Sequence, residues 1–368
     1  MGNILQQLIV ERIQREGPIS FVEYMRMALY APGHGYYVTN RPKFGWEGDF
    51  YTSTDISPLF AHCMGRHLFQ MWESLKRPSP FIVVEQGAGR GHLATGVRDW
   101  AAQEAPDFHA VLDYHTEDIH TGQDATNLSL NTNAPCVILS NELVDAFPVH
   151  VVEVRGKQLY EVYVGVEQGR LREVLDVPSS PEVANYLDTY KIPWRTYEDG
   201  WRAEVNLDAL RWMQQTAERL SGSLQRGKKH GFLLTIDYGD KAQALYTPSL
   251  SRGTLVCYFQ HRLTERPLVR PGEQDITAHV NFSALINEGR RHGLRLHNFT
   301  TQHLWLKSMG MYDELERLRT QEFAAMDSAR ATDQGQVALF RWRMVQQKIM
   351  ALTDPNGMGG FRVLIMKR

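Results

Sequence analysis

Apolar residues recur at helical spacing near the start of the chain. Within residues 3–16 they lie on one face of a helix, at Ile4, Leu5, Leu8, Ile9 and Ile13. Gly17-Pro18 ends this helix, and Ser20 opens a second one by forming a capping box with Glu23. The pattern therefore predicts two short amphipathic helices at the start of the chain.

Short apolar runs alternate with helical patterns along most of the remaining sequence. We expect strands at 81–85, 111–118, 137–139, 232–236 and 361–366. We expect helices at 59–75, 93–100, 203–225, 282–292, 302–325 and 336–352. This alternation predicts an α/β fold with a doubly wound, mostly parallel sheet. Such a sheet binds its ligand beyond the carboxyl ends of the strands.

Two regions fall outside this alternation, namely the N-terminal 75 residues, which form the helical cap, and a segment that begins at residue 149. Residues 149–175 alternate apolar and polar positions, which predicts an antiparallel hairpin or a small sheet. We therefore divide the chain into an N-terminal helical cap, 1–75, and a main domain, 76–368, with an insertion at about 149–230.

Composition narrows the classes of function. The chain has 368 residues and a net charge of −2, which does not favour nucleic-acid binding. No apolar run approaches the roughly 18 residues of a membrane span, and the first residues do not resemble a secretory leader. Cys63, Cys136 and Cys257 are far apart, so neither a disulfide framework nor a zinc site is indicated. We expect a cytoplasmic protein that is not inserted in a membrane and has no bound metal.

A glycine-rich loop follows the first predicted strand of the main domain. Glu85 ends that strand, and Gly87, Gly89 and Gly91 follow at alternate positions. A dinucleotide site would need its third glycine one residue later, where His92 stands. An acid and bare backbone suit a ligand that carries a cation and hydroxyl groups but no phosphate. The loop therefore predicts an S-adenosylmethionine site, and the alternative is a strand–helix turn that binds nothing.

A second acid is expected at the end of the next strand, where it would bind the ribose hydroxyls. Glu117 and Asp118 both stand there, and we favour Asp118. The alternative is that both acids are simply solvated.

These segments together resemble the MidA family, whose mitochondrial members are arginine methyltransferases that help to assemble respiratory complex I. The matching blocks span most of the chain and include 17–21, 35–37, 48–50, 141–149, 237–239 and 275–280. The resemblance implies a class I methyltransferase with a seven-stranded sheet, S-adenosylmethionine as cofactor and a protein substrate such as a complex I subunit. Family members usually have Pro at position 88 and Glu at position 118, where this chain has Ala88 and Asp118.

The resemblance also implies that the N-terminal segment folds over the cofactor. Asp49 would then receive its ammonium group, and Thr52 and Ser53 would bind its carboxylate. The alternative is a structural turn built by these short polar side chains.

Asn141, Glu142 and Asp145 follow a predicted strand and should lie at the carboxyl edge of the sheet. Carboxylates match a guanidinium in a bidentate fork, so this motif would hold an arginine acceptor, with Glu142 accepting its proton. The alternative is that Asp145 caps a helix and Glu142 is solvated. His279 is a candidate aligning donor.

His261, Asp275 and His279 follow the strand that ends at Asp237. They are candidates to line the acceptor pocket. A metal site built from these three is conceivable, although nothing in their spacing demands one.

The first hypothesis for function is a protein-arginine N-methyltransferase. The second is a methyltransferase that acts on another amine or on a small molecule. The third is a non-catalytic assembly chaperone that retains the fold. A homodimer is compatible with all three.

Overall fold

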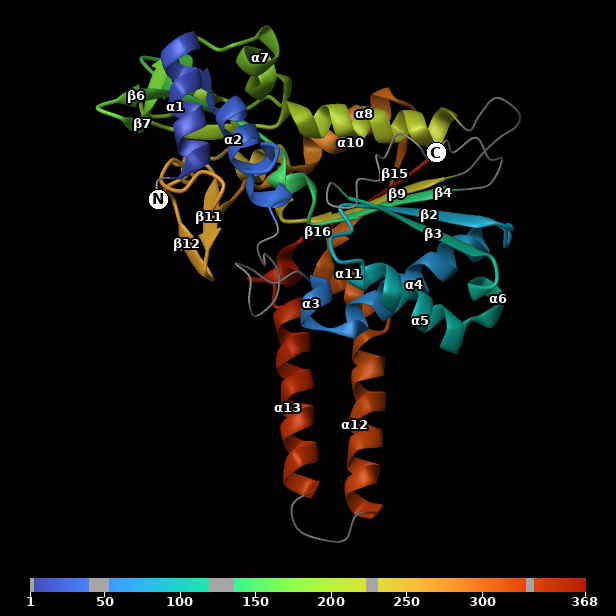
Figure 1. The fold of residues 1–368 in the computed structure, drawn as a ribbon. Coiled ribbons are helices and arrows are strands. Elements are labelled where there is room, and N and C mark those ends of the chain that lie inside the picture. The colour runs from blue at the N-terminus through green and yellow to red at the C-terminus, as the bar shows by residue number, and fades with distance from the viewer. Residues whose placement is uncertain (1–2, 40–52, 119–135, 223–230, 329–333) are drawn as a thin grey trace.

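A six-stranded sheet forms the centre of the computed structural model, which describes residues 3–39, 53–118, 136–222, 231–328 and 334–368 (Figure 1). The strand order is β15-β16-β9-β4-β2-β3. Its strands are β2 (Phe81–Gln86), β3 (Leu112–Glu117), β4 (Cys136–Asn141), β9 (Phe232–Asp237), β15 (Arg295–Thr301) and β16 (Arg362–Lys367). Strands β3, β2, β4 and β9 are parallel, while β16 is antiparallel to both of its neighbours.

The α/β class and the mostly parallel sheet are therefore confirmed. The seventh strand that we expected does not occur within the described ranges. The edge strand β15 was not predicted, because its alternate positions are largely exposed and carry no apolar run.

Helices cover both faces of this sheet. One face packs against α4 (Pro58–Ser74), α5 (His92–Glu104), α6 (Pro106–His109) and α11 (Gln302–Ser308). The other face packs against α8 (Leu207–Gly222) and α10 (Phe282–Arg291). Each face buries its own apolar cluster, so the sheet is shielded from water on both sides, as parallel strands require.

A second sheet forms a separate lobe above the first (Figure 1). It contains β1 (Ile19–Ser20), β5 (His150–Arg155), β6 (Gln158–Glu167), β7 (Arg170–Asp176) and β8 (Arg202–Val205). Helices α1 (Ile4–Glu16) and α2 (Phe21–Tyr30) bury their apolar faces against β5 and β6. Helix α7 (Pro181–Thr189) packs in a neighbouring cluster. The predicted antiparallel strands after residue 149 are confirmed.

The helix that we expected from residue 203 begins later. Residues Arg202–Val205 form β8 instead, because Ala203 and Val205 are buried where β8 pairs with β5. Helix α8 follows from Leu207 and packs on the central sheet. Tertiary pairing here outweighs a helical pattern in the sequence.

The remaining strands and helices are short. The strands are β11 (Val256–Phe259), β12 (Arg262–Thr264) and β13 (Asp275–Thr277) in one small sheet, and β10 (Gly239–Asp240) with β14 (Val280–Asn281) in another. The short helices are α3 (Ser53–Ile56), α9 (Ala242–Leu245), η1 (Tyr36–Val38), η2 (Val144–Ala146), η3 (Trp194–Thr196) and η4 (Met358–Gly360).

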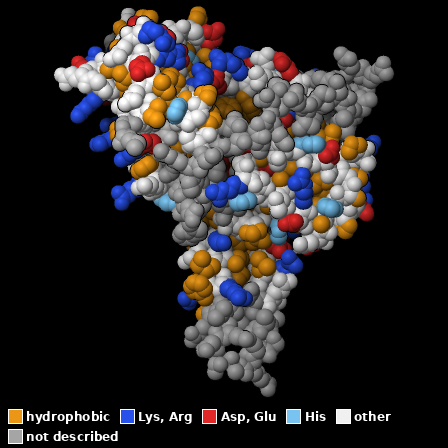
Figure 2. All heavy atoms as spheres, viewed as in Figure 1, with side chains coloured by type: hydrophobic (Ala, Val, Ile, Leu, Met, Phe, Trp, Pro, Cys, Tyr) orange, Lys and Arg blue, Asp and Glu red, His pale blue; other side chains and the backbone are white. Residues whose placement is uncertain are grey.

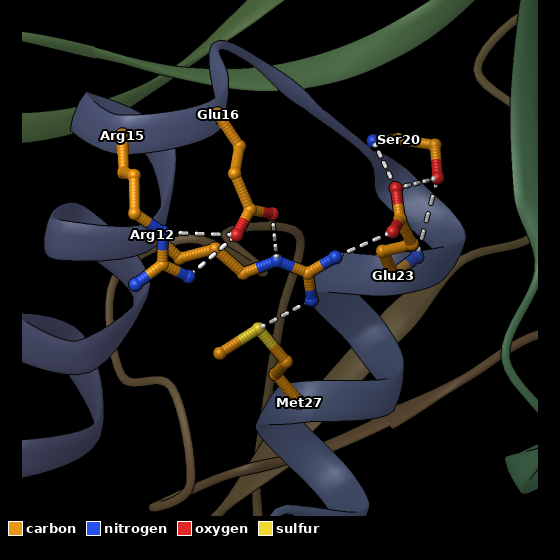
Figure 3. Close-up of polar contacts among 6 residues, drawn as sticks. All are labelled: Arg12, Arg15, Glu16, Ser20, Glu23 and Met27. Atoms are coloured by element: carbon orange, nitrogen blue, oxygen red, sulfur yellow. Dashed lines mark hydrogen bonds and ion pairs between the residues drawn. The ribbon is translucent and has the colours of Figure 1, made fainter.

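The first two helices are held together by polar contacts (Figure 3). Ser20 and Glu23 form the predicted capping box, in which each side chain bonds to the backbone of the other residue. Arg12 of α1 donates to Glu23 at 2.7 Å and to Glu16 at 3.0 Å. The capped end of α2 is thereby joined to α1, which fixes the entry of the chain into the lobe.

The C-terminal half adds a projecting arm. Helices α12 (Met311–Ser328) and α13 (Gln334–Thr353) run side by side away from the body of the molecule (Figure 1). We expected one helix over 302–325, but the chain turns at Gly310, whose φ is +77°, and so separates α11 from α12. No described helix is long and apolar enough to cross a membrane.

The division at residue 75 remains a proposal. Helices α1 and α2 share a core with the lobe, whereas α4 packs on α5 against the central sheet.

Candidate active site

The glycine loop joins β2 to α5 at the carboxyl edge of the central sheet. Gly87, Gly89 and Gly91 have φ values of +72°, +53° and +73°, a region that side chains with a Cβ rarely adopt. A Cβ built on Gly87 would lie 2.8 Å from Leu143 Cδ1. Glycine is therefore required at position 87 both by the backbone conformation and by the close approach of the next loop.

The acid that follows β3 lies against this loop. The backbone N–H of Gly89 donates to Asp118 Oδ2 at 2.9 Å. The backbone N–H of Gly87 donates to the carbonyl of Glu117 at 2.9 Å. The two strand ends are thus tied together, and Asp118 lies beside the loop at the position where a ribose-binding acid is expected.

Glu117 and Glu85 have other partners. Arg219 of α8 binds the Glu117 carboxylate with two bonds, of 2.7 and 2.9 Å. Glu85 is buried and accepts a hydrogen bond from Tyr114 at 2.8 Å, and burial raises its pKa to about 7. That Glu85 binds the cofactor remains a prediction.

The segment after β4 lies next to the glycine loop, because Leu143 contacts Gly87. Glu142 has a φ of +53°, which is unusual for a residue with a side chain and costs roughly 1–3 kcal/mol. Its N–H donates to the carbonyl of Ile236 at 2.9 Å, and this bond holds the turn in place. Such backbone strain is typical of functional sites.

Three carboxyl groups gather where this segment meets the end of β9. Asp237 is fully buried, and its Oδ2 accepts from the N–H groups of Val144 and Asp145 at 2.9 and 3.3 Å. Asp145 is 6% exposed and accepts a hydrogen bond from the hydroxyl of Tyr238. Asp237 therefore anchors the short helix η2, which carries Asp145. The predicted alternative, in which Asp145 caps a longer helix, does not describe this geometry.

The environment disfavours negative charge on all three groups. Removal from water raises the pKa of Glu142 to about 7 and that of Asp145 to about 6. The pKa of Asp237 rises well above its usual range through burial and through its proximity to Asp145 and Glu142. Within the described ranges, no Lys, Arg or His forms an ion pair with any of the three. The cluster would be stabilised by a cation supplied from outside the described chain.

Two polar atoms of the cluster lack a partner. Asn141 Oδ1 and Asp145 Oδ1 are buried without a hydrogen bond from any residue in the described ranges. The amide of Asn141 instead donates to Glu142 Oε1 at 3.1 Å. Unsatisfied buried acceptors are costly, and they mark a position where a donor from a ligand would fit. No His, Cys, Asp or Glu group of metal-binding arrangement occurs in the described part of the chain.

Ser53 reaches this cluster from the N-terminal segment. Its N–H donates to Glu142 Oε1 at 2.9 Å, and its hydroxyl lies 3.4 Å from Gln302 Oε1. Asp49 and Thr52, the other residues expected to cover the cofactor, lie outside the described residues. The N-terminal segment therefore contacts the acceptor motif at Ser53.

The histidine candidates lie further out. The ring of His279 is edge-on to the ring of Tyr238, with centroids 5.4 Å apart, and the side chain is exposed. His261 is exposed in the turn between β11 and β12, where its φ is +59°. Asp275 is buried and accepts from Tyr37 at 2.9 Å.

An aromatic group that sequence reasoning did not assign surrounds the carboxyl cluster. The rings of Tyr30 and Tyr37 stack with centroids 5.6 Å apart, and the hydroxyl of Tyr30 donates to the carbonyl of Ala146 at 2.9 Å. Phe361 packs on Tyr238 at 5.4 Å. Tyr30, Tyr37 and Phe361 belong to segments that carry the family resemblance, whereas nothing in the sequence pointed to Gln302.

Comparison with known proteins gives a consistent result. Residues 63–300 match the model of the Methyltransf_28 family, which is described as an S-adenosyl-L-methionine-dependent methyltransferase. The Drosophila melanogaster protein arginine methyltransferase NDUFAF7 homolog, mitochondrial, is 28% identical over 99% of this chain and 85% of its own length. The Homo sapiens protein of that name is 26% identical over 82% of this chain and 72% of its own.

A solved structure agrees over almost the whole chain. It is a COG1565 superfamily member from Burkholderia thailandensis with S-adenosyl-homocysteine bound. Its TM-score is 0.78 at 26% identity, and the match covers 99% of this chain and 92% of that one. The animal relatives are named as mitochondrial, so the cytoplasmic location that we expected is not confirmed.

Proposed function

The chain belongs to the Methyltransf_28 family of S-adenosyl-L-methionine-dependent methyltransferases, and from this premise we propose that it methylates an arginine side chain of a protein. The observation that carries the proposal is the cluster of Glu142, Asp145 and Asp237, which has no cation from the described chain. A guanidinium supplies both the missing positive charge and a fork of N–H donors.

The residues of the loop fit the cofactor. The three glycines with positive φ leave the loop without side chains at alternate positions, so a ligand can approach the main chain closely, and Asp118 lies beside Gly89. We propose that this loop, with Asp118, holds the adenosine part and that Ser53, together with Asp49 and Thr52, holds the amino-acid part. When bound, S-adenosylmethionine supplies an electrophilic methyl group on a sulfonium.

The acceptor would be held by the motif after β4. Asp145 Oδ1 and Asn141 Oδ1, which accept no hydrogen bond from a side chain in the described ranges, would accept from guanidinium N–H groups. Holding the nucleophilic nitrogen in line contributes most of the rate enhancement. Tyr238 and Asp237 orient the carboxylate of Asp145, through its side chain and its backbone respectively.

Glu142 is the group that we propose accepts the proton. A guanidinium must lose one proton when its nitrogen gains the methyl group. The pKa of Glu142, raised to about 7, makes it a better proton acceptor than an ordinary carboxylate. Its contacts with Ser53 and Asn141 hold the carboxylate between the N-terminal segment and the acceptor motif.

The substrate and the cellular location are also proposals. The names of the animal relatives support a protein substrate, and a subunit of a respiratory complex is the candidate that the resemblance implies. A cytoplasmic site of action is proposed because all three cysteines are buried thiols, which suits a reducing compartment.

A labelling experiment tests the proposal. The protein is incubated with radiolabelled S-adenosylmethionine and lysate from a strain that lacks this gene, and the labelled residue is identified. Label in arginine is the expected result. Label confined to another amine would refute the arginine assignment, and binding of the cofactor without any transfer would favour an assembly chaperone.

The loop is tested separately by Gly87→Val. We expect calorimetry to show no binding of S-adenosyl-homocysteine, because the added side chain would clash with Leu143 and strain the backbone. Gly156→Val is the matched control: its φ is also positive, but it lies in the lobe between β5 and β6, nothing lies within 4 Å of the added Cβ, and cofactor affinity should be unchanged. Near-normal affinity in Gly87→Val would contradict the placement of the cofactor.

A further inference from the structure

A small three-stranded sheet leads away from the carboxyl cluster. Its strand order is β12-β11-β13, and both pairs of strands are antiparallel. Asp275 of β13 lies directly opposite Tyr258 of β11, which in turn lies directly opposite Leu263 of β12. Residues that lie opposite each other in an antiparallel pair have their side chains on the same face of the sheet. The three side chains therefore form one row across the sheet.

The inner end of this row adjoins the carboxyl cluster of Glu142, Asp145 and Asp237. The N–H of Ala278, which directly follows β13, donates to the carbonyl of Asp145 at 3.1 Å. Burial raises the pKa of the Tyr258 hydroxyl, and the nearby charges of Asp145 and Glu142 contribute to the same shift. The row therefore begins at the site that we propose for the acceptor arginine.

The exposure of the side chains rises along the row. Asp275 is 2% exposed, Tyr258 is half-buried and Leu263 is 58% exposed. The other face of the same sheet is filled, because Cys257 and Ile276 are buried in the core that includes α1 and α2. Leu263 is thus the exposed end of a surface whose inner end is the acceptor site.

The surroundings of Leu263 are basic. Arg262 and Arg266 are exposed, and neither forms an ion pair with an acid in the part of the chain that the structure describes. Glu265, which lies between them in the sequence, is paired with Arg252 at 2.7 Å. The hairpin of β11 and β12 lies at the left of the molecule in Figure 1, and Figure 2 shows Lys and Arg side chains on that side. A complementary partner would present an apolar side chain with acids beside it.

We propose that this row binds the segment of the acceptor protein that flanks the methylated arginine. An apolar side chain of that segment would lie on Leu263, and acidic neighbours would lie beside Arg262 and Arg266. The inference rests on the function proposed above and adds a sequence preference to it.

The spacing of the strands sets the position of that apolar residue. Neighbouring strands lie about 4.8 Å apart, so the backbones at Asp275 and Leu263, two strands apart, are separated by about 10 Å. An extended chain covers this length in about three residues. The apolar residue is therefore expected within about three residues of the acceptor arginine.

Fluorescence anisotropy with the full chain, saturated with S-adenosyl-homocysteine, tests the proposal without requiring transfer. The probes are two labelled synthetic peptides of equal length, each with one arginine and the same glutamates on both sides of it. One peptide has leucine and the other has serine among those glutamates. We expect the leucine peptide to bind about fivefold more tightly, because its side chain is partly removed from water. Leu263→Ser should abolish this preference.

Leu296→Ser is the matched control and should keep the preference. Leu296 is 38% exposed on β15 and pairs with Met366, which in turn pairs with Leu233 near the amino end of β9. It therefore lies at the edge of the central sheet that is opposite to the carboxyl cluster. Arg262→Glu/Arg266→Glu should weaken the binding of both peptides and reduce its dependence on salt. Circular dichroism establishes that each variant is folded.

Transfer of a radiolabelled methyl group to the same peptides separates this proposal from the function on which it rests. Leu263→Ser should raise KM for the leucine peptide about fivefold and leave kcat unchanged, since the contact concerns binding alone. Equal affinity of the wild type for the two peptides, including no binding of either, would overturn the proposal. So would a preference for leucine that Leu263→Ser retains. A preference that depends on Leu263, without label in arginine, would support the docking surface and refute the proposed function.

Discussion

Glu117 and Glu142 stand at equivalent places in the fold and have opposite surroundings. Both lie where a parallel strand ends at the carboxyl edge of the central sheet. Glu117 is the last residue of β3, and Glu142 comes directly after β4. Arg219 binds Glu117 with two hydrogen bonds. Glu142 has no cationic partner within the described ranges and lies beside Asp145 and Asp237, two further acids.

This difference in surroundings distinguishes a carboxylate with a structural role from carboxylates that are candidates for binding a ligand. A buried carboxylate with its own arginine is neutralised and holds α8 against the sheet. A group of carboxylates without a cation is costly by itself, so it would be stabilised only by what it binds. The two arrangements lie on the same edge of the sheet. Removing a negative charge should lower the free energy of unfolding in the first and leave it unchanged or raise it in the second.

The largest effect is expected from Asp145→Asn. It removes the charge that we propose holds the guanidinium, while keeping the size of the side chain and a partner for Tyr238. Methyl transfer should fall by about 100-fold or more. Calorimetry should show unchanged binding of S-adenosyl-homocysteine, and the exposed control Glu167→Gln should transfer at the wild-type rate. Intact transfer in Asp145→Asn would remove the acceptor motif from the mechanism.

The next effect concerns stability rather than activity. Glu117→Gln leaves Arg219 partly buried without its anion and should lower the free energy of unfolding by about 2 kcal/mol. Urea unfolding followed by circular dichroism measures this loss. By contrast, Asp145→Asn relieves repulsion within the cluster and should leave the stability unchanged or raise it. Equal losses in both variants would show that the two regions do not differ as described.

A smaller effect is expected from pH. Because the pKa of Glu142 is about 7 and that of Asp145 about 6, protonation should disable the site as the pH falls. Transfer at pH 6 should be about tenfold slower than the plateau above pH 8, and the acid limb belongs to the coupled pair. Initial rates under saturating cofactor measure this limb. In Glu142→Gln the residual rate should titrate only with Asp145, so an unshifted limb would exclude Glu142.

The smallest effect is the change with pH in the contribution that Glu142 makes to the free energy of unfolding. A carboxyl whose pKa is raised by folding binds more protons in the folded state between its unfolded value and about 7. Its contribution to stability is therefore complete below the unfolded pKa and is lost as the pH rises through about 7. The difference in free energy of unfolding between wild type and Glu142→Gln, measured at pH 5 and pH 8, should show this sign. A difference that does not vary with pH would contradict it.

The sequence alone determined the parts that depend on local spacing. The capping box at Ser20 and Glu23 and the strands that surround the glycine loop follow from short patterns, which the fold left in place. The class of the fold and the cofactor could be inferred in the same way, from a buried strand that ends in an acid and leads into glycines at alternate positions, together with the resemblance to a known family. The motif at Asn141, Glu142 and Asp145 was also visible, because it follows a strand.

Only the tertiary structure decided which of these acids have a cation from the described residues beside them. Arg219 lies 102 residues from Glu117, and Ser53 lies 89 residues from Glu142, so no local pattern could pair them. The same holds for β8, where burial against β5 outweighed a helical pattern, and for the approach of Leu143 to Gly87. The charge balance and the burial of a residue depend on all the residues that folding brings into contact with it. The sequence alone does not show which residues these are.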